Sequence, residues 1–146
     1  HISRHWLKQF HSTFGYSLPE DLRICGENLY AQHSIAYDNL LSYFLAFSVW
    51  ERDKCWHWDD TVEYVEKLGL NMVPVLWRGI WDEKKIVQLV EQLDLTRQEG
   101  IVVRRVNAFS MQEFGLYLAK WVRTDHVTTD EHWFNKPVIP NKFRQS

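Results

Sequence analysis

The chain lacks several features that would each assign it to a specialised class of protein. It has only two cysteines, Cys25 and Cys55, which are too few for a disulfide framework and lack the spacing of a zinc site. No apolar run approaches the roughly 18 residues that a membrane-spanning helix needs, and the N-terminus has no signal-peptide character. These absences predict a reduced, cytoplasmic setting without a membrane partner.

A large excess of charge of one sign is also missing. The net charge is −2, which by itself argues against a nonspecific binder of polyanions. The 146 residues are 45% hydrophobic and show no internal repeat, low-complexity tract or linker, so we expect one domain over residues 1–146. Aromatic residues are abundant: eight Trp, six Tyr and eight Phe serve a core first, but such side chains also stack on nucleotide bases.

The first half of the chain contains a predicted helix and two predicted strands. Residues 3–10 pair Trp6 with Phe10 at helical spacing, which predicts a short helix. Residues 23–30 alternate along one strand, whereas residues 43–50 are apolar on both faces, as in a central strand.

Capping residues indicate two further helices. Residues 60–63 resemble a capping box for a helix that ends at Gly69, and Asp82 can cap a second helix. Between them, Pro74 places a short strand over residues 72–77 at a sheet edge.

The last part of the chain predicts two more strands, over residues 100–106 and 116–123. They are followed by a polar tail over residues 124–146, which we expect to wrap the surface. Together, these helices and strands predict an α+β domain with mainly antiparallel sheets and flanking helices.

Two charged residues in these last strands are candidates for chemistry. Residues 99–104 read EGIVVR, so Glu99 stands at the entrance of an apolar strand. In LAKWVR, strand alternation puts Lys120 on one face with Leu118 and Val122. A lysine on an apolar face is costly unless it meets an anion, although an ammonium that snorkels to water near a strand end is an equally weighted alternative.

The earlier strands add a carboxylate and an aromatic ring. Glu27 lies in CGENLY, and Phe47 lies in the aromatic run YFLAFSVW. Taken alone, a solvated glutamate and a core aromatic are the ordinary interpretations of these residues, and Phe44 is a rival of Phe47 for any stacking role.

In this order, the GE of CGENLY, the aromatic strand, EGIVVR and LAKWVR resemble the motifs of the ATP-dependent RNA ligase family of the covalent nucleotidyltransferase superfamily. The resemblance runs from about Arg4 to Asn141. It implies a nucleotidyltransferase (ATP-grasp-like) ligase domain that uses ATP and Mg²⁺. It further implies joining of RNA 5′-phosphate and 3′-hydroxyl ends through lysyl-AMP and RNA-adenylate intermediates.

The resemblance also implies a role for each candidate residue. Glu27 would contact the ribose, Phe47 would stack on adenine, and Lys120 would bind the phosphates of the nucleotide. Glu99 would bind the divalent metal, because magnesium takes oxygen ligands and needs only one or two carboxylates. Glu99 and Lys120 would act catalytically by neutralising charge during nucleotidyl transfer.

The chain departs from the family pattern in two places. None of its lysines is followed by x-Asp-Gly, so the nucleophile motif K-x-D-G that precedes GE in the family is missing. We therefore expect a domain incomplete at its N-terminus and inactive alone in self-adenylylation; the start at His1, without an initiator Met, indicates trimming or a fragment. The family's K-x-K also has Val122 at its second lysine position, and strand alternation would aim Arg123 at the opposite face.

Two alternative functions remain open at this point. One is a DNA ligase or capping-type nucleotidyltransferase, and the other is a non-catalytic nucleotide- or RNA-binding module that has lost its nucleophile. The segments QHSIAY and HVTTDEHW resemble signatures of a bacterial and phage RNA ligase branch, which favours RNA ends as the substrate. The roles of His33, His126 and His132 are left open, and zinc is not expected at the last two, which lack a third ligand at suitable spacing.

Overall fold

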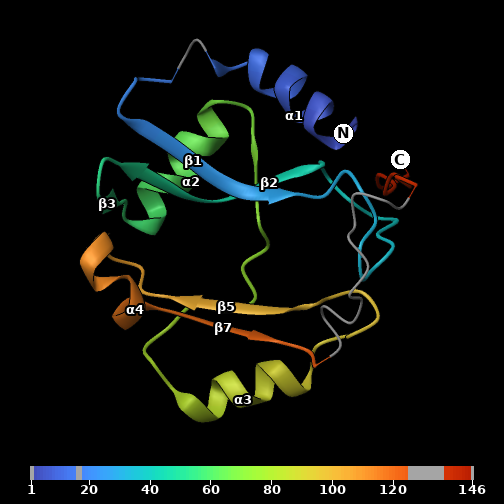
Figure 1. Ribbon diagram of the computed structural model, residues 1–146. Coiled ribbons are helices and arrows are strands. Elements are labelled where there is room, and N and C mark those ends of the chain that lie inside the picture. The colour runs from blue at the N-terminus through green and yellow to red at the C-terminus, as the bar shows by residue number, and fades with distance from the viewer. Residues whose placement is uncertain (1, 16–17, 125–136, 146) are drawn as a thin grey trace.

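Two sheets lie one above the other in the computed structural model, which describes residues 2–15, 18–124 and 137–145 (Figure 1). The larger sheet consists of β1 (Leu22–Asn28), β2 (Phe44–Glu51), β3 (Lys54–Cys55), β4 (Asn71–Met72) and β6 (Phe109–Ser110). The smaller sheet pairs β5 (Gly100–Arg104) with β7 (Leu118–Val122). All pairings are antiparallel except that of β4 with β2, so the mainly antiparallel α+β fold is confirmed.

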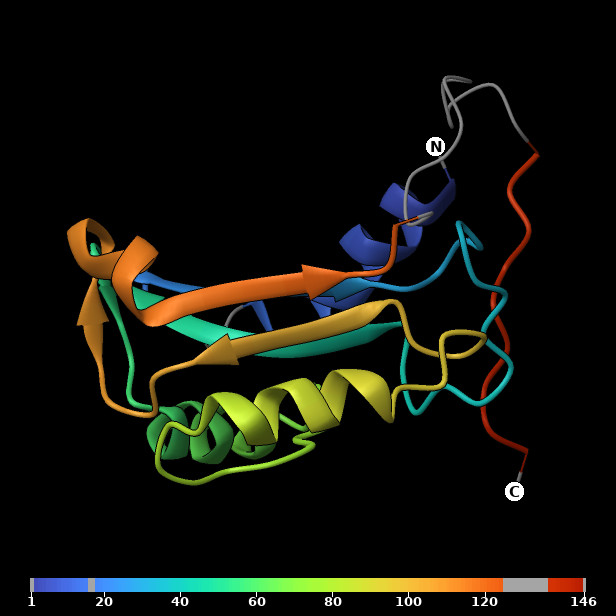
Figure 2. The same ribbon diagram turned by 90° about the horizontal axis from the view of Figure 1, so that it is seen from below.

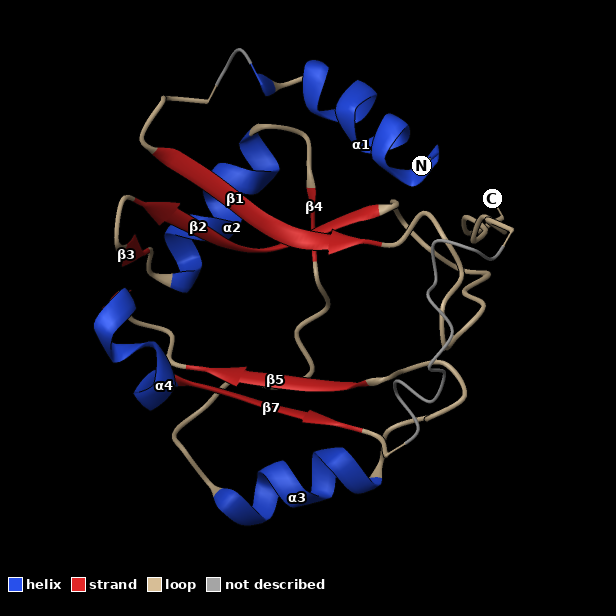
Figure 3. Cartoon of the chain, in the orientation of Figure 1, coloured by secondary structure: helices blue, strands red, loops and turns tan. Residues whose placement is uncertain are grey.

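Helices flank both sheets (Figure 3). The larger sheet is accompanied by α1 (Ile2–Ser12) and α2 (Trp58–Lys67), and α3 (Glu83–Glu91) lies on the side of β5 and β7 away from it (Figure 1). A 3₁₀ turn, η2 (Met111–Glu113), and the short α4 (Phe114–Tyr117) connect β6 to β7. None of the helices in the described ranges has the length and apolar character needed to span a membrane.

The main core covers one face of the larger sheet. Its buried members come from β2, α2 and the residue before β4: Phe44, Ala46, Val49, Val65 and Leu70. Trp6 and Phe10 of α1 pack against this cluster and stack on each other with ring centroids 4.9 Å apart, as their helical spacing predicts. The central position of β2, between β1 and β3, is also confirmed.

A second cluster lies on the other face of the larger sheet. Trp50, Cys55 and Phe109 are buried there, and the Trp50 and Phe109 rings meet edge to face at 5.9 Å. Cys25 and Tyr117 pack against them. Because Tyr117 directly precedes β7, this cluster ties the two sheets together at one end.

The N-terminus of α2 differs from the prediction. The helix begins at Trp58, and the Nδ1 of His57 accepts a hydrogen bond from the backbone N–H of Asp59 at 3.1 Å. The capping box expected at residues 60–63 is therefore wrong, because those residues already lie inside the helix. The acidic side chains of the first turn still complement the positive end of the helix dipole.

Other boundaries match more closely. Asp82 caps α3 by accepting a hydrogen bond from the backbone N–H of Lys85, and Gly69 follows α2 with a φ of 74°, where glycine is favoured. The strand expected over residues 72–77 is reduced to β4, because the chain leaves β2 at Pro74, which has no N–H to donate.

The C-terminal segment is packed into the fold. Ala31 pairs with Pro140 and Leu40 with Phe143 in isolated bridges, and Asn141 is 2% exposed. Figure 2 shows this segment beside the connection between β1 and β2, at one end of the sheets. In the described part, residues 137–145, every residue except Val138 and Asn141 is exposed, so the predicted course over the surface is confirmed there, with Asn141 as a buried anchor.

Candidate functional site

The face of the larger sheet that carries the Trp50 cluster also carries Glu27. Glu27 alternates with Cys25 along β1, and Cys25 packs against that cluster. The register of β1 on β2 shifts between Cys25 and Gly26, so that Phe47 is the extra residue of a β-bulge. Phe47 is 37% exposed, which leaves part of its ring open to contact.

The glycine of the GE motif is explained by packing. A Cβ at Gly26 would lie 2.6 Å from both the ring of Phe44 and the carbonyl oxygen of Leu45. Phe44 is itself buried in the main core, on the face of the sheet opposite Glu27. Phe44 is therefore excluded as a stacking residue, and Phe47 stays the predicted one.

Lys120 lies on the side of the smaller sheet that turns toward the larger one. It pairs with Val102, and alternation puts Arg104 on the same face. The guanidinium of Arg104 donates hydrogen bonds to the Sγ of Cys55 at 3.5 Å and to the carbonyl oxygen of Trp56 at 3.0 Å. Lys120 and Glu27 thus occupy the mutually facing sides of the two sheets, and the expected antiparallel pairing of the strands around Glu99 and Lys120 is confirmed.

The environment of Lys120 differs from the one expected. Residues 114–117 form α4, so the strand begins only at Leu118. Lys120 is exposed, and its neighbour Val102 is 57% exposed. The cost of burying a lysine on an apolar face is therefore absent, and a binding role for Lys120 depends on its position rather than on burial.

Arg123 lies one position beyond the end of β7. Because β7 ends at Val122, strand alternation no longer fixes the direction of Arg123. Its Nη1 donates to the carbonyl oxygen of Leu95 at 2.8 Å, and its Nη2 donates to that of Ser34 at 3.2 Å. Its backbone N–H donates to the carbonyl oxygen of Glu99 at 3.0 Å. None of these bonds places Arg123 relative to Lys120, so the opposite face for Arg123 stays a prediction.

Glu99 lies immediately before β5 and is held by a residue from the connection between β1 and β2. The hydroxyl of Ser34 donates a hydrogen bond to its Oε1. The adjacent glycine is again explained by close approach, because a Cβ at Gly100 would lie 2.0 Å from the carbonyl oxygen of Trp121. Ser34 belongs to the segment QHSIAY, and the sequence of this segment alone does not predict a hydrogen bond to Glu99.

Tyr37 connects the two glutamates electrostatically. Burial raises its pKa, the negative charges of Glu99 and Glu27 raise it further, and Arg123 opposes them, with a net value of about 12. Both carboxylates therefore act electrostatically on the phenol of Tyr37. Tyr37 was not among the predicted site residues, although it lies in QHSIAY, one of the segments that resemble RNA ligase signatures.

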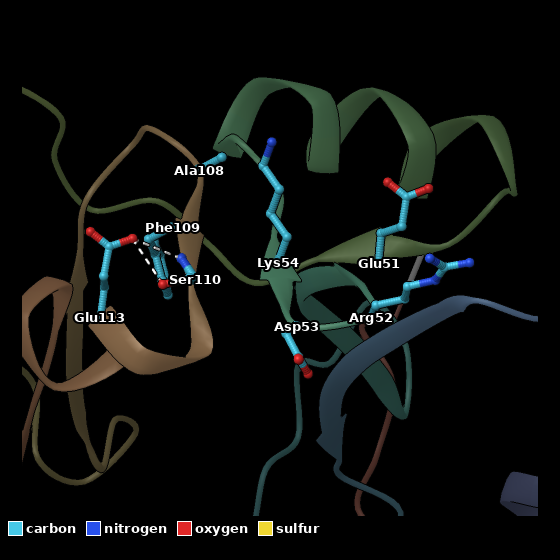
Figure 4. A pocket seen from close by; sticks show the side chains of 8 residues that line it. All are labelled: Glu51, Arg52, Asp53, Lys54, Ala108, Phe109, Ser110 and Glu113. Atoms are coloured by element: carbon cyan, nitrogen blue, oxygen red, sulfur yellow. Dashed lines mark hydrogen bonds between the residues drawn. The ribbon is translucent and has the colours of Figure 1, made fainter.

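Two cavities among the described residues lie outside this set of predicted site residues. One, of about 380 Å³, lies between two connections and is lined by Ile35, Ala36, Tyr37, Asp38, Asn39, Leu40, Asp94, Thr96, Arg97 and Gln98. The other, of about 410 Å³, is lined by Glu51, Arg52, Asp53, Lys54, Ala108, Phe109, Ser110 and Glu113 (Figure 4). Glu27, Phe47, Glu99 and Lys120 line neither cavity.

The predicted magnesium ligand is Glu99, whose carboxylate is the kind of oxygen donor that magnesium takes. In the part of the chain that the structure describes, no group of three or more His, Cys, Asp and Glu could hold a metal ion. Magnesium usually keeps several waters and binds through one or two carboxylates together with substrate phosphates, and Glu99 can provide such a carboxylate. His33 is exposed, and His126 and His132 lie outside the described residues.

The fold is that expected of a ligase or nucleotidyltransferase-like domain. A family model described as RNA ligase matches residues 1–122, and the chain belongs to the RNA ligase family. No curated relative and no solved structure matches the chain. The family resemblance is thereby confirmed, whereas the roles of the individual motif residues remain predictions.

Proposed function

We propose that the chain forms the nucleotide-binding core of an ATP-dependent RNA ligase that joins RNA 5′-phosphate and 3′-hydroxyl ends. The observation that carries this proposal is the placement of Glu27 and Lys120 on the facing sides of two sheets in an RNA ligase family member. The electrostatic effect of Glu27 and Glu99 on one phenol supports a common site for both carboxylates.

Each residue has a distinct task in this proposal. Phe47 offers its exposed ring to adenine, and the carboxylate of Glu27 accepts a hydrogen bond from a ribose hydroxyl. Lys120 donates to the nucleotide phosphates as a charged ammonium, and Glu99 holds the magnesium ion. When bound, magnesium neutralises phosphate charge during nucleotidyl transfer.

The adenylylation step needs a nucleophile that the printed sequence does not contain. An unprotonated lysine amine attacks the α-phosphate, a phosphoramidate bond forms and pyrophosphate leaves; AMP then passes to the RNA 5′-phosphate, and a 3′-hydroxyl displaces it. Lys120 is assigned to phosphate binding, and an ammonium has no lone pair for attack. The 146-residue chain, incubated with labelled ATP and Mg²⁺, should therefore form no covalent AMP adduct that survives denaturing electrophoresis.

A K-x-D-G segment added before His1 should restore labelling if the chain is a ligase core. A non-catalytic binding module, which the missing motif also favours, would bind ATP but stay unlabelled with that segment present. Robust labelling of the 146-residue chain itself would contradict the proposed role of its lysines.

The nucleotide site is tested by ATP binding to the 146-residue chain, with one lysine removed at a time. Lys120→Ala should weaken binding by about tenfold or more, because a hydrogen bond to a charged group contributes roughly 1.5–3 kcal/mol. Lys54→Ala is the matched control, since Lys54 is also an exposed strand lysine but lines the distant cavity of Figure 4. Equal affinity in both variants would contradict the assignment of Lys120.

A further inference from the structure

The hydrogen bond between Ser34 and Glu99 joins segments that lie 65 residues apart in the sequence. Ser34 lies in the connection between β1 and β2, and Glu99 precedes β5 of the other sheet. The contact therefore links the connection of one sheet to the entrance of the other.

Arg123 fixes the backbone of both partners. Its backbone N–H donates to the carbonyl oxygen of Glu99 at 3.0 Å, and its Nη2 donates to the carbonyl oxygen of Ser34 at 3.2 Å. Its Nη1 also holds the carbonyl oxygen of Leu95, at 2.8 Å. One residue thus sets the distance between the serine and the glutamate.

Asn141 fixes the connection on both sides of Ser34. Its Nδ2 donates to the carbonyl oxygens of Leu29 at 2.8 Å and Ala31 at 3.2 Å, ahead of Ser34. Its Oδ1 accepts a hydrogen bond from the backbone N–H of Tyr37 at 2.8 Å, beyond Ser34. Because Asn141 is almost fully buried, these bonds have little competition from water.

We propose that Ser34 is a positioning residue that orients the Glu99 carboxylate toward the magnesium ion. The inference rests on the proposed function, in which Glu99 holds that ion. A carboxylate has about four acceptor positions, so one hydrogen bond fixes its orientation without exhausting its capacity to bind a cation. Outer partners of this kind typically change metal affinity by roughly 10–100-fold.

The test compares three variants of the 146-residue chain. Ser34→Ala removes the hydroxyl, and Ser34→Thr retains it at the same exposed position. Ser110→Ala is the matched control, because the Ser110 hydroxyl also donates to a glutamate, the Oε1 of Glu113, at 3.0 Å (Figure 4). That pair lines the distant cavity and has no part in the proposed site.

The measured quantity is the magnesium concentration at which binding of a fluorescent ATP analogue is half-maximal. Ser34→Ala should raise this concentration by roughly 10–100-fold, Ser34→Thr should restore the wild-type value, and Ser110→Ala should leave it unchanged. The melting temperature of each variant, measured without magnesium, separates loss of stability from loss of metal affinity.

The outcomes distinguish the inference from the function on which it rests. If the wild-type chain shows no magnesium-dependent binding of the analogue, the proposed function fails and the positioning role falls with it. If the wild type binds but Ser34→Ala behaves as wild type, shifts only as Ser110→Ala does, or is not rescued by threonine, the positioning role alone is overturned.

Discussion

The two faces of the larger sheet place the same strands in different surroundings. On one face, β2 packs against α1 and α2, and Val49 is completely buried. On the other face, the end of β2 near Glu51 is covered by Phe109 and Tyr117. Phe47, the bulged residue of the same strand, is 37% exposed. The β-bulge at Phe47 shifts the side-chain alternation of β2 by one residue without interrupting the strand.

Two phenylalanines on β2 provide the strongest test of this difference. Phe44→Ala should lower the free energy of unfolding by about 3–5 kcal/mol, because it empties a core position. Phe47→Ala should cost much less stability but weaken ATP binding by about 1–3 kcal/mol, through loss of base stacking. Urea unfolding and ATP titration measure the two effects. Similar losses of stability in both variants would show that Phe47 is a core residue as well.

The smaller sheet, which faces the larger one, depends on close contact between its two strands. Gly100→Ala should destabilise the chain by about 1–3 kcal/mol, because the added Cβ meets the carbonyl oxygen of Trp121 at 2.0 Å. Gly115→Ala is the control, since a Cβ there has nothing within 4 Å. Thermal unfolding of both variants should show a clear decrease in melting temperature for the first alone, and equal melting temperatures would refute the close approach.

Tyr37 should give the smallest effect, visible only at high pH. Its pKa is about 12 in the folded chain and about 10 in an unfolded one, so folding favours the neutral phenol. The resulting stabilisation is complete below pH 10 and is lost as the pH rises from about 10 to 12. Between pH 9 and pH 11, the free energy of unfolding should therefore decrease less in Tyr37→Phe than in wild type. Parallel decreases would mean that neither burial nor the two glutamates act on this phenol.

The sequence predicted the elements that are defined by local patterns. The helix around Trp6 and Phe10, the central strand β2 and the cap at Asp82 depend on neighbours within a few residues. The two-residue strands β3 and β6 were missed, because such strands exist only through distant partners. The single turn of α4 was missed as well, and its residues were assigned to the following strand.

The candidate site also has parts that local patterns predict and parts that depend on distant contacts. Motif order predicted Glu27, Phe47, Glu99 and Lys120 as site residues, and the structure places Glu27 and Lys120 on facing sides of the sheets. The hydrogen bond of Ser34 to Glu99 and the position of Tyr37 depend on how a long connection folds back, which no local pattern encodes. The direction of Arg123 stays a prediction, because this residue lies one position beyond the end of β7.

The burial of Asn141 also has a consequence for where the domain can be cut. The family match ends at residue 122, yet Asn141 supplies hydrogen bonds to the backbone of Leu29, Ala31 and Tyr37. A protein shortened to the matched residues would leave those backbone groups without these partners and would expose the aromatic ring of Tyr43, on which Phe143 packs at 4.2 Å. A minimal fragment for expression should therefore extend at least to Arg144, whose backbone N–H pairs with the carbonyl oxygen of Leu40.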